Sequence, residues 1–252
     1  MDGSNGTFTF CSRASGPVSP RDEDVRFELG DSDAVAWLDG LPAASVDLLI
    51  TDPPYESLEK HRAIGTTTRL KHSKSSSNDW FSVFPNHRFP ELFRAVYRVL
   101  KRDSHFYLFV DQETMFVAKP LAEAAGFKFW KPLVWDKQKI GMGYHYRSRY
   151  ELILFFEKGK RKLNDLGIAD VISASRIARG YPAEKPVEVS EVLIRQSTVP
   201  DALVVDPFMG SGSVGVASLR LGRRFKGTDT SPMARELTRG RLHAELTGAP
   251  KL

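Results

Sequence analysis

The sequence has very little cysteine and no long apolar run, and each shortage excludes a class of protein. Its 252 residues include one cysteine, Cys11, in a polar N-terminal segment. One thiol cannot form an intramolecular disulfide or a cysteine-based metal site, and scarce cysteine fits a reducing cytoplasm. No apolar segment approaches the roughly 20 residues that cross a membrane, and the N-terminus lacks a signal-peptide layout. We expect a soluble, cytoplasmic protein without a metal site or a membrane partner.

Apolar residues are nevertheless plentiful enough for one folded domain. Hydrophobic residues make up 41% of the chain and aromatic residues 11%, which suits an ordinary globular core. The formal net charge of +5 permits a polyanionic partner without requiring one. Residues 1–24 are polar and rich in glycine, serine and proline, which favours a flexible N-terminal arm. We therefore predict a single domain over residues 25–248.

Apolar runs alternate with helical patterns along this domain. Continuous apolar runs are typical of strands covered on both faces, as in parallel sheets. Between them, residues 90–101 place Leu92, Phe93, Val96, Val99 and Leu100 on one helical face, and Ser32 and Ser231 are candidate helix caps. The pattern predicts an α/β fold with a doubly wound, Rossmann-like sheet of seven strands. The expected strands are residues 25–29, 46–51, 105–110, 127–135, 150–158, 202–206 and 225–229.

Two polar segments interrupt this rhythm, at residues 56–89 and 159–185. Both are longer than ordinary connections, and such segments are often functional or mobile loops. The simpler interpretation of either one alone is solvated surface.

A glycine-rich turn follows the predicted strand 202–206, with Gly210, Gly212 and Gly215 in G-x-G-x-x-G spacing. This layout is typical of nucleotide sites, where a later acid, here Asp229, accepts from ribose hydroxyls. A purely structural turn is the alternative. A carboxylate at Asp206, just before the glycines, would lie poorly beside a pyrophosphate. An NAD-binding oxidoreductase is therefore less favoured than a ligand with an ammonium group and no phosphate, such as S-adenosylmethionine.

The position of this turn predicts the sheet topology. One strand and one helix follow it, so the other strands must come from upstream, and the cofactor half is C-terminal in a circularly permuted order. Ligands of doubly wound sheets bind outside the carboxyl ends of neighbouring strands. We expect the strand that ends at Asp52 to lie beside the strand that ends at Asp206.

The sequence Asp52-Pro53-Pro54-Tyr55 follows a buried strand and fits methyl transfer to an exocyclic amine. Such an amine is a poor nucleophile until acceptors localise its lone pair. The Asp52 carboxylate and the Pro53 carbonyl, held by the stiff proline pair, can be those acceptors. Tyr55 offers a ring on which a flipped base stacks. A tight turn is the alternative interpretation. Methylation at a ring carbon would instead need a cysteine nucleophile, for which Cys11 is poorly placed.

The order of "DPPY", "EKPVEVSEVLIRQS" and "DPFMGSG" resembles the amino-group DNA methyltransferases of the β class, over about residues 27–246. The resemblance implies S-adenosylmethionine as cofactor, double-stranded DNA as substrate and direct transfer to the N6 amine of adenine after base flipping. Members that methylate cytosine N4 more often carry serine at the position of Asp52, so N4-cytosine is the alternative. RNA remains open as a substrate. The family also suggests a homodimer and a role in restriction-modification.

The resemblance assigns a set of residues to the cofactor site. Lys185 with Pro186 would lie beside the methionine end, Phe208 and Thr230 would flank the pocket, and Asp31 would contact the adenine unless it only belongs to the helix start. The full set is Asp31, Lys185, Asp206, Pro207, Phe208, Gly210, Ser211, Gly212, Asp229 and Thr230.

Basic residues of the second half form a candidate DNA-binding surface, with Tyr144, His145 and Tyr146 among them. A solubilising face is the alternative, and a catalytically silent nucleic-acid-binding module is a further one. The loops 56–89 and 159–185 are candidate recognition elements, and Trp135 is expected at the end of a core strand. The candidate DNA-binding residues are Lys137, Lys139, Arg147, Arg149, Lys160 and Arg161, with Lys158, Lys162, Arg176 and Arg179 nearby.

Overall fold

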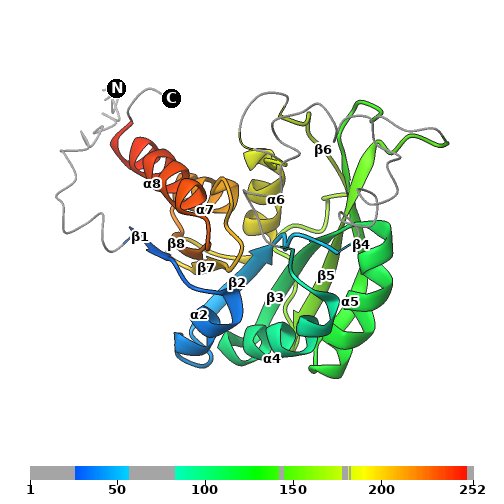
Figure 1. Cartoon of the computed structure of the whole chain (residues 1–252), viewed down its shortest axis with the longest axis horizontal. Helices are drawn as coiled ribbons and strands as arrows, with labels where there is room; N and C mark the ends of the chain where they lie inside the picture. Colours follow the sequence, from blue (N-terminus) through cyan, green and yellow to red (C-terminus); the bar gives the residue numbers. More distant parts are fainter. Residues whose placement is uncertain (1–25, 57–82, 142–144, 178–180, 182, 249–252) are drawn as a thin grey trace, which may run out of the picture.

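The computed structural model describes residues 26–56, 83–141, 145–177, 181 and 183–248. The predicted N-terminal arm, most of the loop 56–89, Tyr144 and Arg179 lie outside these ranges. Helices and strands alternate along the described chain (Figure 1). The elements are β1 (Phe27–Gly30), α2 (Ala34–Gly40), β2 (Val46–Thr51), η3 (Asn86–Arg88), α4 (Phe89–Val99), β3 (Leu100–Val110), α5 (Gln112–Ala124), β4 (Lys128–Asp136), β5 (Tyr150–Lys158), β6 (Val171–Ser173), α6 (Val187–Ser197), β7 (Leu203–Asp206), α7 (Ser213–Arg220), β8 (Arg224–Thr228) and α8 (Pro232–Thr247).

In the described part of the chain, eight strands form one sheet in the order β1-β8-β7-β2-β3-β5-β4-β6. The first five of these are mutually parallel, whereas β5 runs antiparallel to both β3 and β4. The predicted count of seven strands is wrong because β6 was not expected. This strand lies inside the segment 159–185, predicted as a loop, and pairs with the end of β4. Its three residues are too few to show a period.

Side chains alternate between two apolar layers, as they must in a pleated sheet. Leu49, Phe106 and Leu108 face α2, α4 and α5, whereas Leu48 and Ile50 face α6, α7 and α8. Helices thus cover both faces of the sheet (Figure 1), which confirms the doubly wound prediction. None of the helices in the described ranges combines the length and apolar character that a membrane crossing demands.

Two local expectations about helix ends are wrong. Asp33, not Ser32, caps α2, since its carboxylate accepts from the backbone N–H groups of Val35 and Ala36. Ser32 instead exchanges two hydrogen bonds with the Thr228 hydroxyl, which fixes the end of β1 on β8. Leu100 begins β3 rather than continuing α4. The predicted cap at Ser231 is confirmed by its bond to the N–H of Ala234.

The neighbouring positions of β2 and β7 decide where the site lies. Leu48 pairs with Val204 and Leu49 with Val205 in parallel register. The carboxyl ends of both strands therefore open on the same edge of the sheet, as predicted, and deliver Asp52 and Asp206 to one place.

Candidate active site

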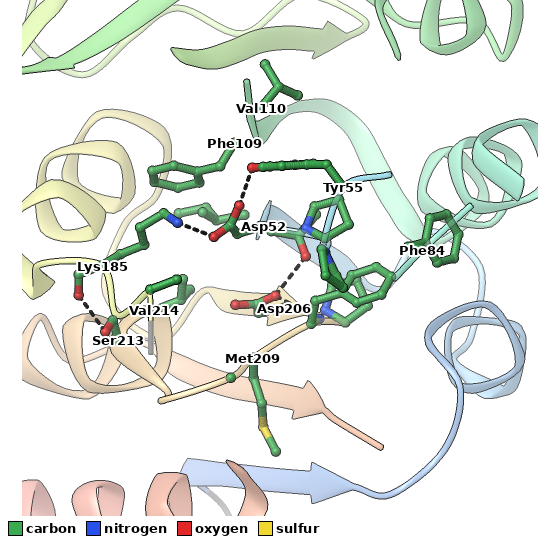
Figure 2. Close-up of a pocket in the computed structure, with 18 of the residues that line it drawn as sticks. Asp52, Tyr55, Phe84, Phe109, Val110, Lys185, Asp206, Met209, Ser213 and Val214 are labelled. Carbon is green, nitrogen blue, oxygen red and sulfur yellow. Dashed lines mark hydrogen bonds and ion pairs between the residues drawn. The ribbon is translucent and has the colours of Figure 1, made fainter. Parts of the chain in front are cut away.

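A cavity of about 640 Å³ opens at this edge of the sheet. The ends of β2, β7 and β8, the start of β5 and the segment before α6 contribute its walls. Figure 2 shows Asp52, Lys185 and Asp206 around this space. Asp52, Pro53, Pro54 and Tyr55 all line it, together with Asp206. The predicted acceptor residues and the predicted cofactor turn therefore face a shared space.

The segment after β2 is held in place by hydrogen bonds on both sides. The Tyr55 hydroxyl donates to Oδ1 of Asp52 (Figure 2). Phe84 donates its backbone N–H to the Pro54 carbonyl over 2.8 Å. Burial and then the Asp52 charge raise the pKa of Tyr55 well above its usual value, so the hydroxyl stays protonated and remains a donor. The two prolines and these hydrogen bonds make the segment Asp52–Tyr55 rigid.

Lys185 connects two carboxylates across the cavity. Its ammonium donates to Oδ2 of Asp52 and lies 3.3 Å from Oε2 of Glu151. Lys137 pairs with Oε1 of Glu151 at 2.7 Å. Burial lowers the pKa of Lys185, but the charges of Asp52 and Glu151 outweigh burial and raise it overall. Lys185 was predicted to contact the cofactor; it lines the cavity, yet its ammonium contacts the acceptor Asp52.

Glu151 was not identified from the sequence. Burial raises its pKa, but the charges of Lys185 and Lys137 outweigh burial and lower it overall. It is the second residue of β5, in a run interpreted as a core strand. A signal was present, because a carboxylate near the start of an apolar strand is rarely placed there for packing.

Asp206 ends β7 and is almost fully buried. It accepts from the Thr51 hydroxyl at 2.8 Å and from the N–H of Phe208 at 3.0 Å. Burial nevertheless raises its pKa to about 7, and the charges of Asp52 and Asp229 act in the same direction. This wall of the cavity therefore favours a positively charged group.

Asp229, after β8, completes the glycine turn. Its carboxylate accepts from the N–H of Gly210 at 3.0 Å and from the N–H of Ser231 at 2.8 Å. Burial raises its pKa too. The remaining predicted cofactor residues that line the cavity are Pro207, Phe208, Gly210, Ser211 and Thr230.

Two predicted cofactor residues, Gly212 and Asp31, are not among the cavity-lining residues. Gly212 has φ +78°, and a Cβ there would lie 2.6 Å from Cγ2 of Thr238. It is needed for the turn to pack on α8. Asp31 is exposed, whereas Asp33 lines the cavity, and the contact of Asp31 with the adenine stays a prediction.

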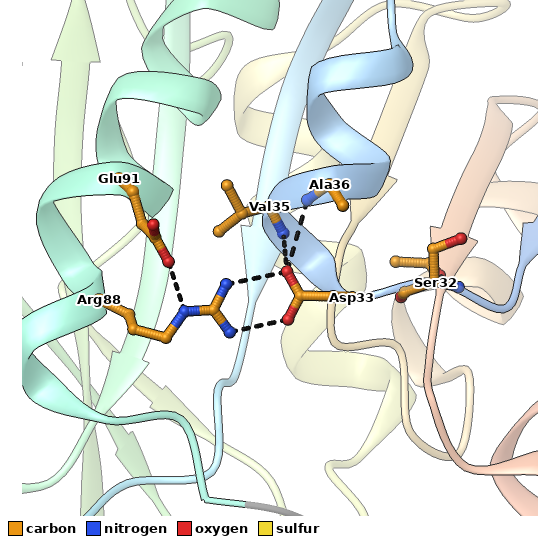
Figure 3. A network of polar contacts seen from close by, with 7 residues as sticks. Ser32, Asp33, Val35, Ala36, Arg88 and Glu91 are labelled. Carbon is orange, nitrogen blue, oxygen red and sulfur yellow. Dashed lines mark hydrogen bonds and ion pairs between the residues drawn. The ribbon is translucent and has the colours of Figure 1, made fainter.

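Asp33 and Arg88 join two helix starts at the cavity wall (Figure 3). The guanidinium donates to both oxygens of Asp33, at 2.8 and 3.0 Å, and also pairs with Glu91. It lies over the Phe84 ring, 5.0 Å from the centroid. The hydrogen bond from Arg88 holds the pKa of Asp33 below its usual value. No sequence pattern singles out Arg88, because it lies at the end of the polar segment 56–89.

The candidate DNA-binding residues do not share one surface. Strand β5 runs antiparallel, so its last residue pairs with Ser104 at the start of β3, on the edge opposite the cavity. Lys160 and Arg161 follow that end, and a single surface that includes them is therefore wrong. Of the described residues between β4 and β5, Lys137 and Ser148 line the cavity. Lys137 pairs with Glu151 and Arg149 pairs with Asp136 at 2.6 Å, whereas Lys139 and Arg147 are exposed.

Lys158 and Trp135, the two remaining residues considered in the sequence, have structural contacts. Lys158 donates to the carbonyls of Tyr97 and Leu100, both at 2.6 Å. Trp135 is buried in the core, as expected, and its indole N–H donates to the Ala174 carbonyl at 2.8 Å.

Comparisons with known proteins agree with this geometry. YubD, assigned as a methylase in Escherichia coli strain K12, is 31% identical over 205 residues, which cover 81% of this chain and 84% of YubD. The type II methyltransferase M2.DpnII of Streptococcus pneumoniae is 28% identical, over 85% of this chain and 88% of that protein. The crystal structure of the M1.HpyAVI–SAM complex superposes with a TM-score of 0.63 at 20% identity, over 86% of this chain and 100% of that one.

The sequence profile of the DNA methylase family, which comprises N6 and N4 methyltransferases, matches residues 46–239. This range begins with β2 and ends in α8, so it contains both the Asp52 corner and the glycine turn. The chain therefore belongs to the DNA methylase family.

Proposed function

We propose that this protein transfers a methyl group from S-adenosylmethionine to the exocyclic N6 amine of adenine in double-stranded DNA. The observation that carries the proposal is the shared cavity between Asp52 and the turn after Asp206. A methyl donor and an acceptor amine must meet within van der Waals contact, and adjacent strand ends bring their two sites that close. The chain order, with the Asp52 corner ahead of the cofactor turn, supports the β class and its permuted topology.

The residues of the cavity fit this cofactor. Asp206 is a buried carboxylate whose pKa of about 7 a bound ammonium would lower, since opposite charge favours the ionised form. Asp229 is placed to accept from ribose hydroxyls, as acids after the second strand of such sheets do. Phe208 and Val214 give the cavity apolar surface. The relative M1.HpyAVI was crystallised with the same cofactor. Bound S-adenosylmethionine would supply a methyl group on a positively charged sulfur.

The chain's own residues prepare the amine. Asp52 and the Pro53 carbonyl accept from its two N–H groups and so concentrate the lone pair on nitrogen. Tyr55 and Phe84 line the cavity and offer rings for the flipped base. As the new N–C bond forms, the bond between the methyl carbon and sulfur breaks and its electron pair stays on sulfur. The nitrogen gains positive charge next to Asp52 and then loses one proton to Asp52 or to water.

DNA contact is proposed for the exposed basic residues Lys139 and Arg147, which lie in the sequence between Lys137 and Ser148 of the cavity wall. Their guanidinium and ammonium groups suit backbone phosphates on either side of a flipped base. Adenine is favoured over cytosine by aspartate at position 52 and by a 26% identity to the DNA adenine methyltransferase YhdJ of Escherichia coli strain K12.

The test is to incubate the protein with DNA and S-adenosylmethionine and to weigh the nucleosides after digestion. We expect a methyl mass shift on deoxyadenosine. A shift confined to deoxycytidine contradicts the adenine assignment, and no shift on any nucleoside contradicts DNA methyl transfer. Asp52→Ala should lower the turnover number by about 10² or more, the loss typical of a removed transition-state contact. Its affinity for the cofactor, measured by calorimetry, should stay within about twofold.

A further inference from the structure

Both oxygens of the acceptor carboxylate already have partners in the structure. Oδ1 of Asp52 accepts from the Tyr55 hydroxyl, and Oδ2 accepts from the Lys185 ammonium. An amine N–H is a weaker donor than an ammonium, so it competes poorly for the same oxygen. Each carboxylate oxygen can accept more than one hydrogen bond, but Oδ2 is a stronger acceptor for the target amine once the Lys185 ammonium has moved away from it.

A second carboxylate is placed to receive that ammonium. Oε2 of Glu151 lies 3.3 Å from Lys185 Nζ, a short movement from a hydrogen bond. The side chain of Lys185 is 14% exposed, so it cannot turn to bulk water instead. Its base is fixed, because the Lys185 carbonyl accepts from the Ser213 hydroxyl at 2.7 Å. The ammonium can therefore pivot between two carboxylates while the backbone stays in place.

We propose that Glu151 is a positioning residue, which receives the Lys185 ammonium when the target amine binds and so frees Oδ2 of Asp52 as acceptor. This inference rests on the proposed function. The exchange keeps the local charge balanced, since two carboxylates, Asp52 and Glu151, face two ammonium groups, Lys185 and Lys137, before and after it. Burying an uncompensated charge would be costly, and this exchange avoids it.

The first experiment is Glu151→Gln, which keeps the shape and removes the charge. Lys185 should then remain on Asp52, so kcat should fall about tenfold or more while the KM for S-adenosylmethionine stays within about twofold. Asp170→Asn is the matched control, because this carboxylate also pairs with a lysine, Lys131, at 2.7 Å but lies on the surface. It should leave both constants unchanged. An unchanged kcat for Glu151→Gln overturns the proposal.

The second experiment repeats the substitution in a Lys185→Met background. If Glu151 acts through Lys185, its loss should cost nothing further once the lysine is absent. The same fold-loss in both backgrounds would show that Glu151 acts independently and would overturn the proposal.

A crystal structure of the wild-type protein with cofactor and adenine DNA needs no variant to fold. We expect Nζ of Lys185 nearer to Glu151 than to Asp52 in that complex, and the reverse overturns the proposal. If the wild-type protein methylates DNA and Glu151→Gln does so equally well, the proposed role of Glu151 is refuted and the proposed function is not. A wild-type protein without methyl transfer refutes the proposed function as well.

Discussion

We expect the protonation of Asp206 to be coupled to cofactor binding. Its pKa is about 7, against an ordinary value of 3.8. An ammonium ligand binds the ionised form, so affinity should rise with pH up to about 7 and level off above it. With one proton involved, the change is at most tenfold per pH unit. Calorimetric titration with S-adenosylmethionine at pH 5.5 to 8.5 measures this slope.

Asp206→Asn keeps the hydrogen bonds to Oδ1 from Thr51 and Phe208 and removes the titrating group. In this variant the affinity for S-adenosylmethionine should no longer change with pH. At pH 8 the affinity should be lower than that of the wild type. A slope that survives in this variant would assign the effect to another group.

The same residue predicts a cost in stability for the cofactor-free protein. Because the folded pKa of Asp206 exceeds the unfolded one, the folded state holds a proton that the unfolded state releases. The stabilisation of the folded state by this proton is complete below about pH 4 and is lost as the pH rises through about 7. Asp206→Asn should therefore unfold at a higher temperature than the wild type at pH 8, by calorimetry without cofactor, and the difference should shrink at pH 5. A lower unfolding temperature at pH 8 would mean that the carboxylate stabilises the fold.

The turn between β7 and α7 contributes Gly210 and Ser211 to the cavity wall. Gly212 has a left-handed φ of +78°, and Thr238 of α8 fills the space where a Cβ would go. Gly212→Ala should lower the free energy of unfolding by about 1–3 kcal/mol and weaken cofactor binding. Gly240→Ala, in α8, is the matched control, since a Cβ there meets nothing within 4 Å. It should raise the free energy of unfolding by about 0.4–1 kcal/mol. Urea titration distinguishes the two, and equal effects would contradict the packing argument.

Strand β5 shows where the sequence was informative and where it was not. The apolar run 150–158 predicted a buried strand, and β5 has those bounds. The same run fits a parallel or an antiparallel strand here, because helices cover both faces of this sheet. Its direction comes from pairing with β3 and β4, which lie far away in the chain. That direction brings Glu151 to the cavity and takes Lys160 to the opposite edge.

The corner Asp52–Tyr55 and the glycine turn were predictable because each is continuous in sequence and follows a strand. The Asp33–Arg88 pair joins residues 55 positions apart, and no local pattern links them. The cap at Asp33 rather than Ser32 was undecided locally as well, because both residue types cap helices equally well.

Lys158, at the end of β5 opposite the cavity, links β5 to the end of α4. Its ammonium donates to two carbonyls, those of Tyr97 and Leu100, at the end of α4. A cation there satisfies carbonyls that the helix leaves free. Lys158→Met should reduce the free energy of unfolding by about 1–2 kcal/mol in urea titration and leave DNA affinity unchanged. A loss of DNA affinity with unchanged stability would restore the phosphate-binding interpretation of this lysine.

At the scale of the whole molecule, the two edges of the sheet should differ in their affinity for DNA. The cavity opens at one edge, and Lys139 and Arg147 are exposed residues between β4 and β5, where Lys137 and Ser148 line the cavity. Lys160 and Lys162 are equally exposed but follow the other end of β5. A duplex that delivers a base to the cavity must lie across the first edge, and its phosphates can reach the first pair of residues but not the second.

Two double variants test this difference. Each replaces two basic residues with glutamine, so both lose the same net charge. Lys139→Gln with Arg147→Gln should weaken DNA binding and reduce the slope of log K against log salt by about 0.9 for each lost phosphate contact. Lys160→Gln with Lys162→Gln should leave both the affinity and the slope as in the wild type, if position rather than total charge determines binding. Fluorescence anisotropy with a labelled duplex over 50 to about 200 mM salt measures both quantities. Equal losses in the two variants would mean that DNA responds to net charge alone, and the cavity edge would then have no special part in binding.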